Sequence, residues 1–542
     1  MWIPNCREMQ GNVKRSSKKL AATPRYVSPR QLTLEGFETP FDQKLNQENR
    51  WVKMAHAIPW DKIVPYYDRL FSSSEGRPPI SGRVVIGAMI IKHIENLTDR
   101  RTLLHIEENM FMQYFLGYSS FTNDAPFTAP LFVEIRKRLT FDLLSKINDI
   151  IVQHCLQENE EDNPPPPPHH KDRLSVDPIV DKEPLSDTTT TSAKCAGVPA
   201  VATPEALPVN KGKLLADATV APQNITYPTD LKLLNAARRK SEELIDLLYI
   251  PGLHGPVKPR TYRRTAHKLF VNTAKKKRNS QKEIYKSTGR QLRFLRRNLN
   301  HIETLLTAFE YFPLTPREQK YLMVLHTVYE QQEQMHRNHI HRIEDRIVNI
   351  HQPHVRPIVR GKEKEKVEFG SKLQVSVVDG FVLIDRLSWD AFNEGNYLIQ
   401  SVENYKKRLG CYPQEVLADQ IYCNRENRAW LKGKNIRLIA KPLGRPSASA
   451  VAVHLSPGQR NPIEGKFGQG KVAYGLNNIK AKLKQTSESW IAAIALVLNL
   501  VALTRRAPVS LHQKVYELIN KTLLFICNVS PKFFYQKRIG VI

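Results

Sequence analysis

Two aspartates stand where short apolar strands are expected to end. Leu214-Leu215-Ala216 precedes Asp217, and Val416-Leu417-Ala418 precedes Asp419. Carboxylates at strand ends are candidate ligands for Mg²⁺, which prefers oxygen donors and binds a few carboxylates together with substrate phosphate. Two such ions about 4 Å apart can act on the attacking and leaving oxygens of a phosphodiester. An aspartate after a strand also often only caps the next turn, so either residue alone leaves both interpretations open.

A third acid, Glu464, lies in a glycine-rich stretch between Arg460 and Lys471. The bases on either side could hold phosphate. Four glycines between positions 465 and 475 make the stretch a poor helix by intrinsic propensity. Spacing alone does not join Glu464 to the two aspartates.

Three stretches together resemble the acidic motifs of bacterial insertion-sequence DDE transposases. They are residues 217–230, 418–422 and 460–471. Arg460, Glu464 and Lys471 match the group of that superfamily with an Arg, three residues, Glu, six residues, Lys signature. The tyrosine that usually precedes the arginine by three positions is Pro457 here. The resemblance also includes 78–121 and 490–500, and in all it touches most of 78–155 and 211–502.

The resemblance implies that Asp217, Asp419 and Glu464 are catalytic and bind two Mg²⁺ ions, for which Mn²⁺ could substitute. One ion would activate water, and later a DNA 3′ hydroxyl, for in-line attack, while the other would stabilise the leaving oxygen. Arg460 and Lys471 would bind phosphates of the transposon end. The implied partners are double-stranded DNA, as transposon end and as target, and a second copy of the chain, because two DNA ends must be paired.

One departure from the family pattern concerns the chain after the first aspartate. In the usual RNase H-like core, the strand carrying that aspartate runs directly into the next strand, whereas about 150 residues separate Asp217 from Leu373 here. We expect a helical insertion domain that contacts DNA at about 252–365. Asp379, in an Asp-Gly turn, and Asp385, within an expected strand, are weaker alternatives for the first carboxylate.

Positive charge is concentrated in this insertion. The chain has 81 Lys and Arg against 53 Asp and Glu, a formal net charge of +28, and residues 258–297 hold 15 of the bases with one acid. Bases neutralise phosphates and release counterions, and interleaved rings such as Tyr262 and Phe294 can stack on exposed nucleobases. The alternatives are a solvated helix face that contacts nothing and, less favoured, an anionic membrane surface. The expected DNA-binding residues are Lys275, Lys276, Lys277, Arg278, Arg293, Arg296 and Arg297, besides Arg460 and Lys471.

Hydrophobic periodicity predicts the elements that position these residues. Helical spacing predicts helices over 80–96, 100–108 and 131–153, in a helical N-terminal DNA-binding domain at 51–155 that could hold a helix-turn-helix. Two further apolar stripes, over 292–306 and 340–350, predict an antiparallel helical hairpin. Its second helix would carry His336, His339 and His341 as polar-face residues.

Strand-like alternation begins at Phe369. Expected strands are 373–377, 382–384, 415–418 and 436–440, the first two joined by a turn at Asp379-Gly380, with helices over 394–409 and 490–503. Strands that alternate with helices after a hairpin indicate a mixed sheet. The predicted fold class is therefore α/β: an RNase H-like mixed-sheet catalytic core at 211–510, with the helical N-terminal and insertion domains.

Three segments are expected to lie outside these domains. They are a flexible basic arm at 1–50, a disordered linker at 156–210 and a C-terminal tail at 511–542. The linker holds ten of the 36 prolines and no aromatic residue, so it cannot bury enough apolar surface to fold alone.

Composition excludes several other classes. Six cysteines without a CxxC pair give neither a disulfide framework nor a zinc site, and favour a reducing cytoplasm. The resemblance implies a place at the bacterial nucleoid. The longest apolar run, 491–503, is shorter than the roughly 20 residues that span a bilayer, so no membrane segment is expected. The predicted function is a DNA transposase that cleaves at terminal inverted repeats and joins the 3′ ends to target DNA. A catalytically inactive DNA-binding derivative and a metal-dependent nuclease without strand transfer are the alternatives.

Overall fold

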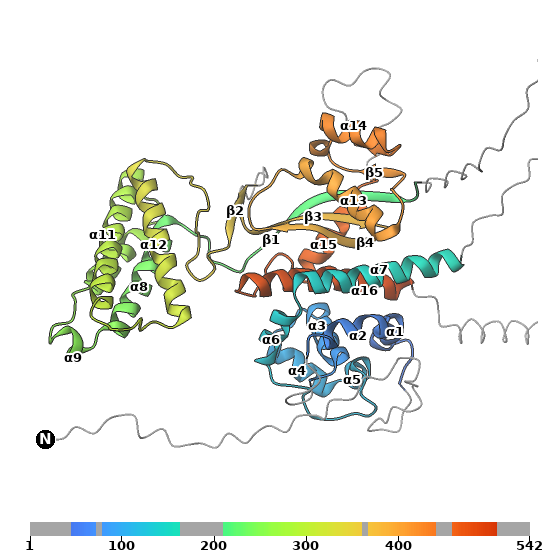
Figure 1. Ribbon diagram of the computed structural model, residues 1–542, viewed down its shortest axis with the longest axis horizontal. Helices are drawn as coiled ribbons and strands as arrows, with labels where there is room; N and C mark the ends of the chain where they lie inside the picture. The colour runs from blue at the N-terminus through green and yellow to red at the C-terminus, as the bar shows by residue number, and fades with distance from the viewer. Residues whose placement is uncertain (1–44, 72–78, 163–209, 360–366, 441–457, 507–542) are drawn as a thin grey trace, which may run out of the picture.

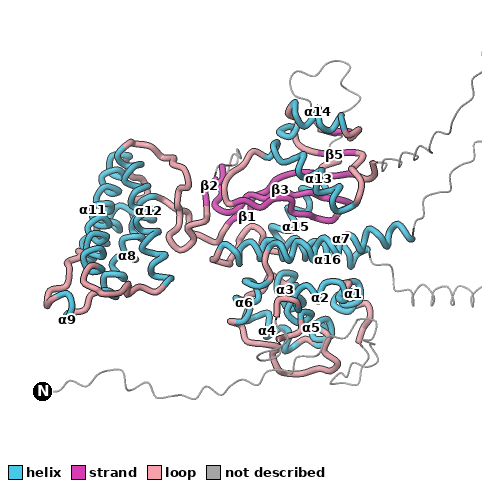
Figure 2. Tube along the Cα trace, in the orientation of Figure 1, coloured by secondary structure: helices cyan, strands magenta, loops and turns pink. Residues whose placement is uncertain are grey.

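The computed structural model describes residues 45–71, 79–162, 210–359, 367–440 and 458–506. A mixed sheet and its helices form the centre, with one helical group beneath it and a second to its side (Figure 1). The strands are confined to the central part (Figure 2). The predicted C-terminal tail and most of the predicted arm and linker lie outside the described residues.

The N-terminal part is helical, as predicted. Its helices are α1 (Arg50–Ala57), α2 (Trp60–Asp68), α3 (Gly82–Ile94), α4 (Asp99–Glu108), α5 (Met110–Leu116), α6 (Leu131–Arg138) and α7 (Phe141–Asp162). The single helix expected over 131–153 is two helices, because the Thr140 hydroxyl accepts from the Leu143 backbone N–H and starts α7 afresh. The expectation of a disordered linker from 156 is wrong for its first residues, since α7 continues to Asp162.

The sheet has the strand order β2-β3-β1-β5-β6, with β4 also paired to β3. Its strands are β1 (Lys213–Pro222), β2 (Arg356–Val359), β3 (Val367–Val378), β4 (Phe381–Ser388), β5 (Glu415–Leu417) and β6 (Arg437–Ile439). β3 is antiparallel to β1, β2 and β4, whereas β5 is parallel to both β1 and β6. This α/β arrangement is compatible with the predicted RNase H-like core.

Helix α16 (Lys484–Arg506) connects the sheet to the N-terminal helices (Figure 1). Asn499 on α16 accepts from the Val382 backbone N–H at 2.6 Å and donates to the Asn148 side chain on α7 at 2.8 Å. By length and composition α16 could cross a membrane, but 83% of its apolar window is buried inside the protein. Such burial is typical of a core helix.

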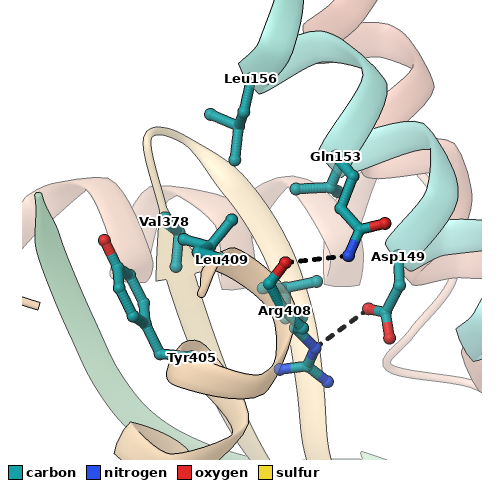
Figure 3. A pocket seen from close by; sticks show the side chains of 9 residues that line it. Asp149, Gln153, Leu156, Val378, Tyr405, Arg408 and Leu409 are labelled. Atoms are coloured by element: carbon teal, nitrogen blue, oxygen red, sulfur yellow. Dashed lines mark hydrogen bonds and ion pairs between the residues drawn. The ribbon is translucent and has the colours of Figure 1, made fainter. Parts of the chain in front are cut away.

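A second junction joins α7 to α13 (Leu398–Leu409), as Figure 3 shows. Arg408 forms ion pairs with Asp149 at 3.1 Å and with Asp385 at 2.9 Å, and its carbonyl accepts from Gln153 at 2.9 Å. The cavity between these helices is only about 10 Å³, close to the minimum for one water molecule. This junction is therefore structural.

The insertion lies between β1 and β2 and consists of helices. They are α8 (Asp230–Leu248), α9 (Pro251–His254), α10 (Arg263–Ala274), α11 (Gln281–Leu306) and α12 (Pro316–Arg337). α8, α11 and α12 share a hydrophobic cluster of their own, built around residues such as Leu234, Leu299 and Val328. The helix expected over 340–350 is wrong: α12 is the partner of α11, and a Thr315–Glu318 capping box starts it.

The remaining elements follow β4, β5 and β6 along the chain. They are the short helices η2 (Glu394–Tyr397) and η3 (Gln420–Tyr422), together with α14 (Arg425–Gly433) and α15 (Asn461–Val472). The amide of Asn427 on α14 donates to the carbonyls of Gly395 and Tyr422 at 2.7 and 2.9 Å. These bonds hold η2 against η3, directly after Asp419.

Candidate active site

Asp217 lies in the middle of β1, not at the strand end that the sequence predicts. β1 continues to Pro222 because residues 216–222 pair with β3. The carboxylate is 16% exposed and accepts from the Ala218 backbone N–H at 2.8 Å. Burial raises the pKa of Asp217, and the Ala218 bond and the Arg460 guanidinium offset part of that increase.

Asp419 reaches the same place from the neighbouring strand. Leu215 pairs with Leu417 between parallel β1 and β5; Asp217 is two residues further along β1, and Asp419 is two residues past Leu417, just beyond the end of β5. Side chains two residues apart share a face of a sheet, so the two carboxylates lie on the same face. Asp419 also accepts from the Gln420 N–H at 2.8 Å and caps η3, so its structural role and its place beside Asp217 coexist.

Arg460 bridges the two aspartates. Its guanidinium donates to Asp217 Oδ2 at 2.9 Å and lies 3.3 Å from Asp419 Oδ1. Arg460 occupies the N-cap position of α15 beside Asp217 on β1, and its side chain is 19% exposed. Two carboxylates separated by about 200 residues in the sequence therefore converge on one cationic group.

Glu464 lies in the first turn of α15, four residues after Arg460, and is exposed. The expectation that the glycines weaken this helix is wrong. Pro462 stands in its first turn, Ile463 is fully buried, and Gly470 is buried beside Leu498 of α16. Packing thus overrides propensity. Lys471 is in the last turn of the same helix.

A further acid near Asp217 is one that sequence patterns do not predict. Glu394, in η2, forms an ion pair with Lys372 on β3 at 2.8 Å. Burial is the main cause that raises the pKa of Asp217, and the negative charge of Glu394 raises it further. Burial and the same charge also raise the pKa of Tyr422. No strand end or motif marks Glu394, because its position depends on how η2 packs against η3.

The weaker alternatives for the first carboxylate lie elsewhere. Asp379 sits in the predicted turn between β3 and β4, with a φ of 47°. Asp385 on β4 is 1% exposed and is held by Arg408 at 2.9 Å and Asn404 at 3.2 Å. The Arg460 guanidinium contacts Asp217 and Asp419, whereas Asp385 is paired with Arg408.

A divalent cation fits this donor set in part. Asp217 and Asp419 already share one cationic partner, and carboxylate oxygens suit Mg²⁺. Among the described residues, however, no three Asp, Glu, His or Cys side chains form a group that could hold a metal ion. The structure therefore brings the carboxylates of Asp217 and Asp419 together at Arg460, and Glu464 lies on the adjoining helix α15.

The predicted DNA-binding bases of the insertion lie in the loop between α10 and α11 and on α11. Lys275, Lys276, Lys277 and Arg278 are exposed, as are Arg293 and Arg296 on α11. Lys276 forms an ion pair with Glu283 at 2.7 Å. Arg297 differs, because it is half-buried with its guanidinium over the rings of Tyr262 and Phe294.

Family models of transposases match two parts of the chain. A family model for a transposase DDE domain matches residues 416–501, which include Asp419 and Glu464, and a model for a transposase domain (DUF772) matches residues 39–138. These two matches support the interpretation of the chain as an insertion-sequence DDE transposase, and they confirm the predicted resemblance. Transposases act on DNA, and the DDE family generally uses a divalent metal.

One curated relative is similar over part of the chain. It is an uncharacterized protein, ORF8 in the nfe locus of Rhizobium meliloti, 28% identical over 121 residues. The match spans 22% of this chain and 58% of that protein's length. No solved structure matches the chain.

Proposed function

We propose that this protein is a DNA transposase that cleaves at the terminal inverted repeats of an insertion sequence and joins the 3′ ends to target DNA. The observation that carries the proposal is the convergence of Asp217 and Asp419 on Arg460 at neighbouring parallel strands. A site of two carboxylates and an arginine can bind a cation and a phosphate side by side. Phosphoryl transfer needs both.

Each residue has a role in this proposal. Asp217, Asp419 and Glu464 would hold two Mg²⁺ ions, or Mn²⁺ in their place. When bound, the metal would supply Lewis-acid stabilisation at the oxygens of the scissile phosphodiester. Arg460 and Lys471 lie at opposite ends of α15 and would hold phosphates of the transposon end. Glu464 must turn toward the sheet edge to complete the set.

DNA would extend from this site onto the basic helices of the insertion. The exposed bases of α10 and α11 supply a surface that neutralises phosphates without reading sequence. Two transposon ends must be held together for joining, so we propose a homodimer on DNA. The protein would act in the cytoplasm, at the bacterial nucleoid.

The test uses purified protein, Mg²⁺ or Mn²⁺, and DNA that carries the inverted repeats flanking the coding region. Cleavage and joining are scored separately. We expect both in the wild type, neither in Asp217→Ala, and both in the matched control Asp379→Ala. An Asp217→Ala protein that still cleaves and joins would refute the assignment of this carboxylate.

The same assay separates the two alternative functions. Cleaved ends that are never joined would indicate a nuclease without strand transfer. DNA binding without cleavage, in either metal, would indicate an inactive DNA-binding derivative.

A further inference from the structure

The insertion exposes a group of large apolar side chains at one end, which we call the insertion tip. Two segments form it: residues 247–257, which hold the end of α8 and the short helix α9, and residues 309–312, between α11 and α12. Figure 1 shows α9 at the outer end of the insertion, away from the sheet. Six side chains of these segments are between 44% and 80% exposed: Leu247, Ile250, Leu253, Val257, Tyr311 and Phe312.

His254 holds the two segments of the insertion tip together. Its Nε2 is 2.9 Å from the carbonyl oxygen of Leu305, in the last turn of α11, and its ring lies 5.2 Å from the Phe309 ring. The ring of Tyr249 lies 6.1 Å from the His254 ring, and the Tyr249 hydroxyl donates to the Gly255 carbonyl at 2.7 Å. The exposed apolar side chains therefore belong to segments that are fixed to the helical core.

The charge of the insertion tip contrasts with that of the helices beside it. Residues 241–257 and 298–316 contain five acids and no lysine or arginine, whereas residues 258–297 contain 15 bases and one acid. One of the five acids, Asp246, is neutralised by Arg263 at 2.8 Å. An apolar surface without basic side chains thus borders strongly basic helices.

The area of the insertion tip is large enough for a protein contact. At about 100 Å² for each of the six side chains, the tip exposes roughly 600 Å² of apolar surface, the upper end for the largest apolar patch on a monomer. Two such tips in contact would bury roughly 1,200 Å², which reaches the lower limit for specific protein–protein interfaces. A contact between two tips can therefore be specific.

We propose that the insertion tip binds the tip of a second copy of this chain, in a symmetric contact that forms without DNA. The formal net charge of +28 makes two copies repel each other, so the basic helices cannot face their own counterparts. In a two-fold contact each surface meets itself, which favours an apolar surface without bases. The choice of a second copy as the occupant rests on the proposed function, which requires two copies on DNA.

The test measures self-association of the DNA-free, full-length protein by sedimentation at a series of protein concentrations and at low and high salt. We expect a monomer–dimer equilibrium with a Kd of about 1 µM. The Kd should decrease as NaCl rises from about 0.1 M to about 0.5 M, because salt screens the repulsion between the two basic chains. An apolar contact does not weaken under the same change.

A double variant tests the assignment of the surface. Val257→Glu together with Tyr311→Glu places charges at the two most exposed of the six positions, where the side chains are 80% and 76% exposed. Thermal unfolding should be unchanged, because exposed positions tolerate substitution. The Kd should rise about a hundredfold, because the contact would bury unpaired carboxylates. Val472→Glu is the matched control, because Val472 is an 82% exposed side chain at the end of α15, outside the insertion, and it should leave the Kd unchanged.

Each outcome decides one point. A wild-type protein that stays monomeric at the highest concentration would overturn the inference, and so would a dimer that the double variant does not weaken. A dimer that dissociates as salt rises would indicate that acids of the tip bind the basic helices of another copy, and would overturn the symmetric contact. Cleavage and joining are scored separately, so a wild type that dimerises through its tip but neither cleaves nor joins DNA would refute the proposed function and support the contact.

Discussion

Arg460 should compete with divalent metal for the two aspartates. Its guanidinium occupies the position between Asp217 and Asp419 at 2.9 and 3.3 Å, so a metal ion that uses both carboxylates must displace it. Replacing the guanidinium in Arg460→Ala removes this competitor. We therefore expect the variant to bind Mn²⁺ more tightly than the wild type in the absence of DNA.

The structure sets the size of the effect. Unit charges about 4 Å apart interact by about 4 kcal/mol at an effective dielectric constant of about 20. The Asp419 contact contributes little, because that carboxylate is 55% exposed. Desolvation of Asp217 and Arg460 offsets part of the other contact. A net value of roughly 1–2 kcal/mol remains, which corresponds to about a tenfold decrease in the Kd for Mn²⁺.

Calorimetric titration of Mn²⁺ into DNA-free protein measures this directly, and thermal unfolding checks that each variant is folded. Arg437→Ala is the matched control, because Arg437 pairs with Glu415 at 3.5 Å on the adjacent strands and touches neither aspartate. An unchanged or weaker affinity in folded Arg460→Ala would refute the competition. An equal gain in Arg437→Ala would attribute the effect to net charge.

Three other perturbations have defined outcomes. Arg408→Ala should lower the free energy of unfolding by about 3–5 kcal/mol in a denaturant titration, because it leaves the buried Asp385 without its cation. Burial lowers the pKa of His354 to about 4, so the folded state disfavours its charged form. The contribution of neutral His354 to the free energy of unfolding is full above pH 6.5 and should be lost as the pH falls toward 4. The free energy of unfolding of His354→Phe should fall by less over the same range. Replacing the four bases at 275–278 by alanine should reduce the slope of log binding constant against log salt concentration by about 3. The reduction is about 3 and not 4 because Lys276 is already paired with Glu283. An unchanged slope would contradict this placement of DNA.

Sequence periodicity predicted most of the elements around the site. The helix α13, the β3–β4 hairpin with its turn at Asp379, and the short strands β5 and β6 all lie where the pattern predicts them. These elements depend on local alternation, helical spacing and turn residues, which a short window of sequence contains.

Features that depend on distant contacts were missed. β1 is longer than its apolar run because β3 pairs with all of it, and α15 forms despite its glycines because α16 packs against it. Glu394 approaches Asp217 only through the packing of η2 against η3. Tertiary contacts decide such positions, and no local pattern encodes them.

The pairing of β1 with β3 also explains how the chain accommodates a long insertion beside its site. Pro222 pairs with Gly370, and the next residue, Gln223, donates its backbone N–H to Phe369 at 2.8 Å, so the two strands stay paired to the point where the insertion begins. An added Cβ at Gly370 would lie 2.1 Å from the Ala221 carbonyl oxygen, which requires glycine there. Since the closure cost of a long segment grows only slowly with its length, and the insertion has its own hydrophobic cluster, its helices can vary without disturbing β1. The basic surface is thereby attached to the same strand that carries Asp217.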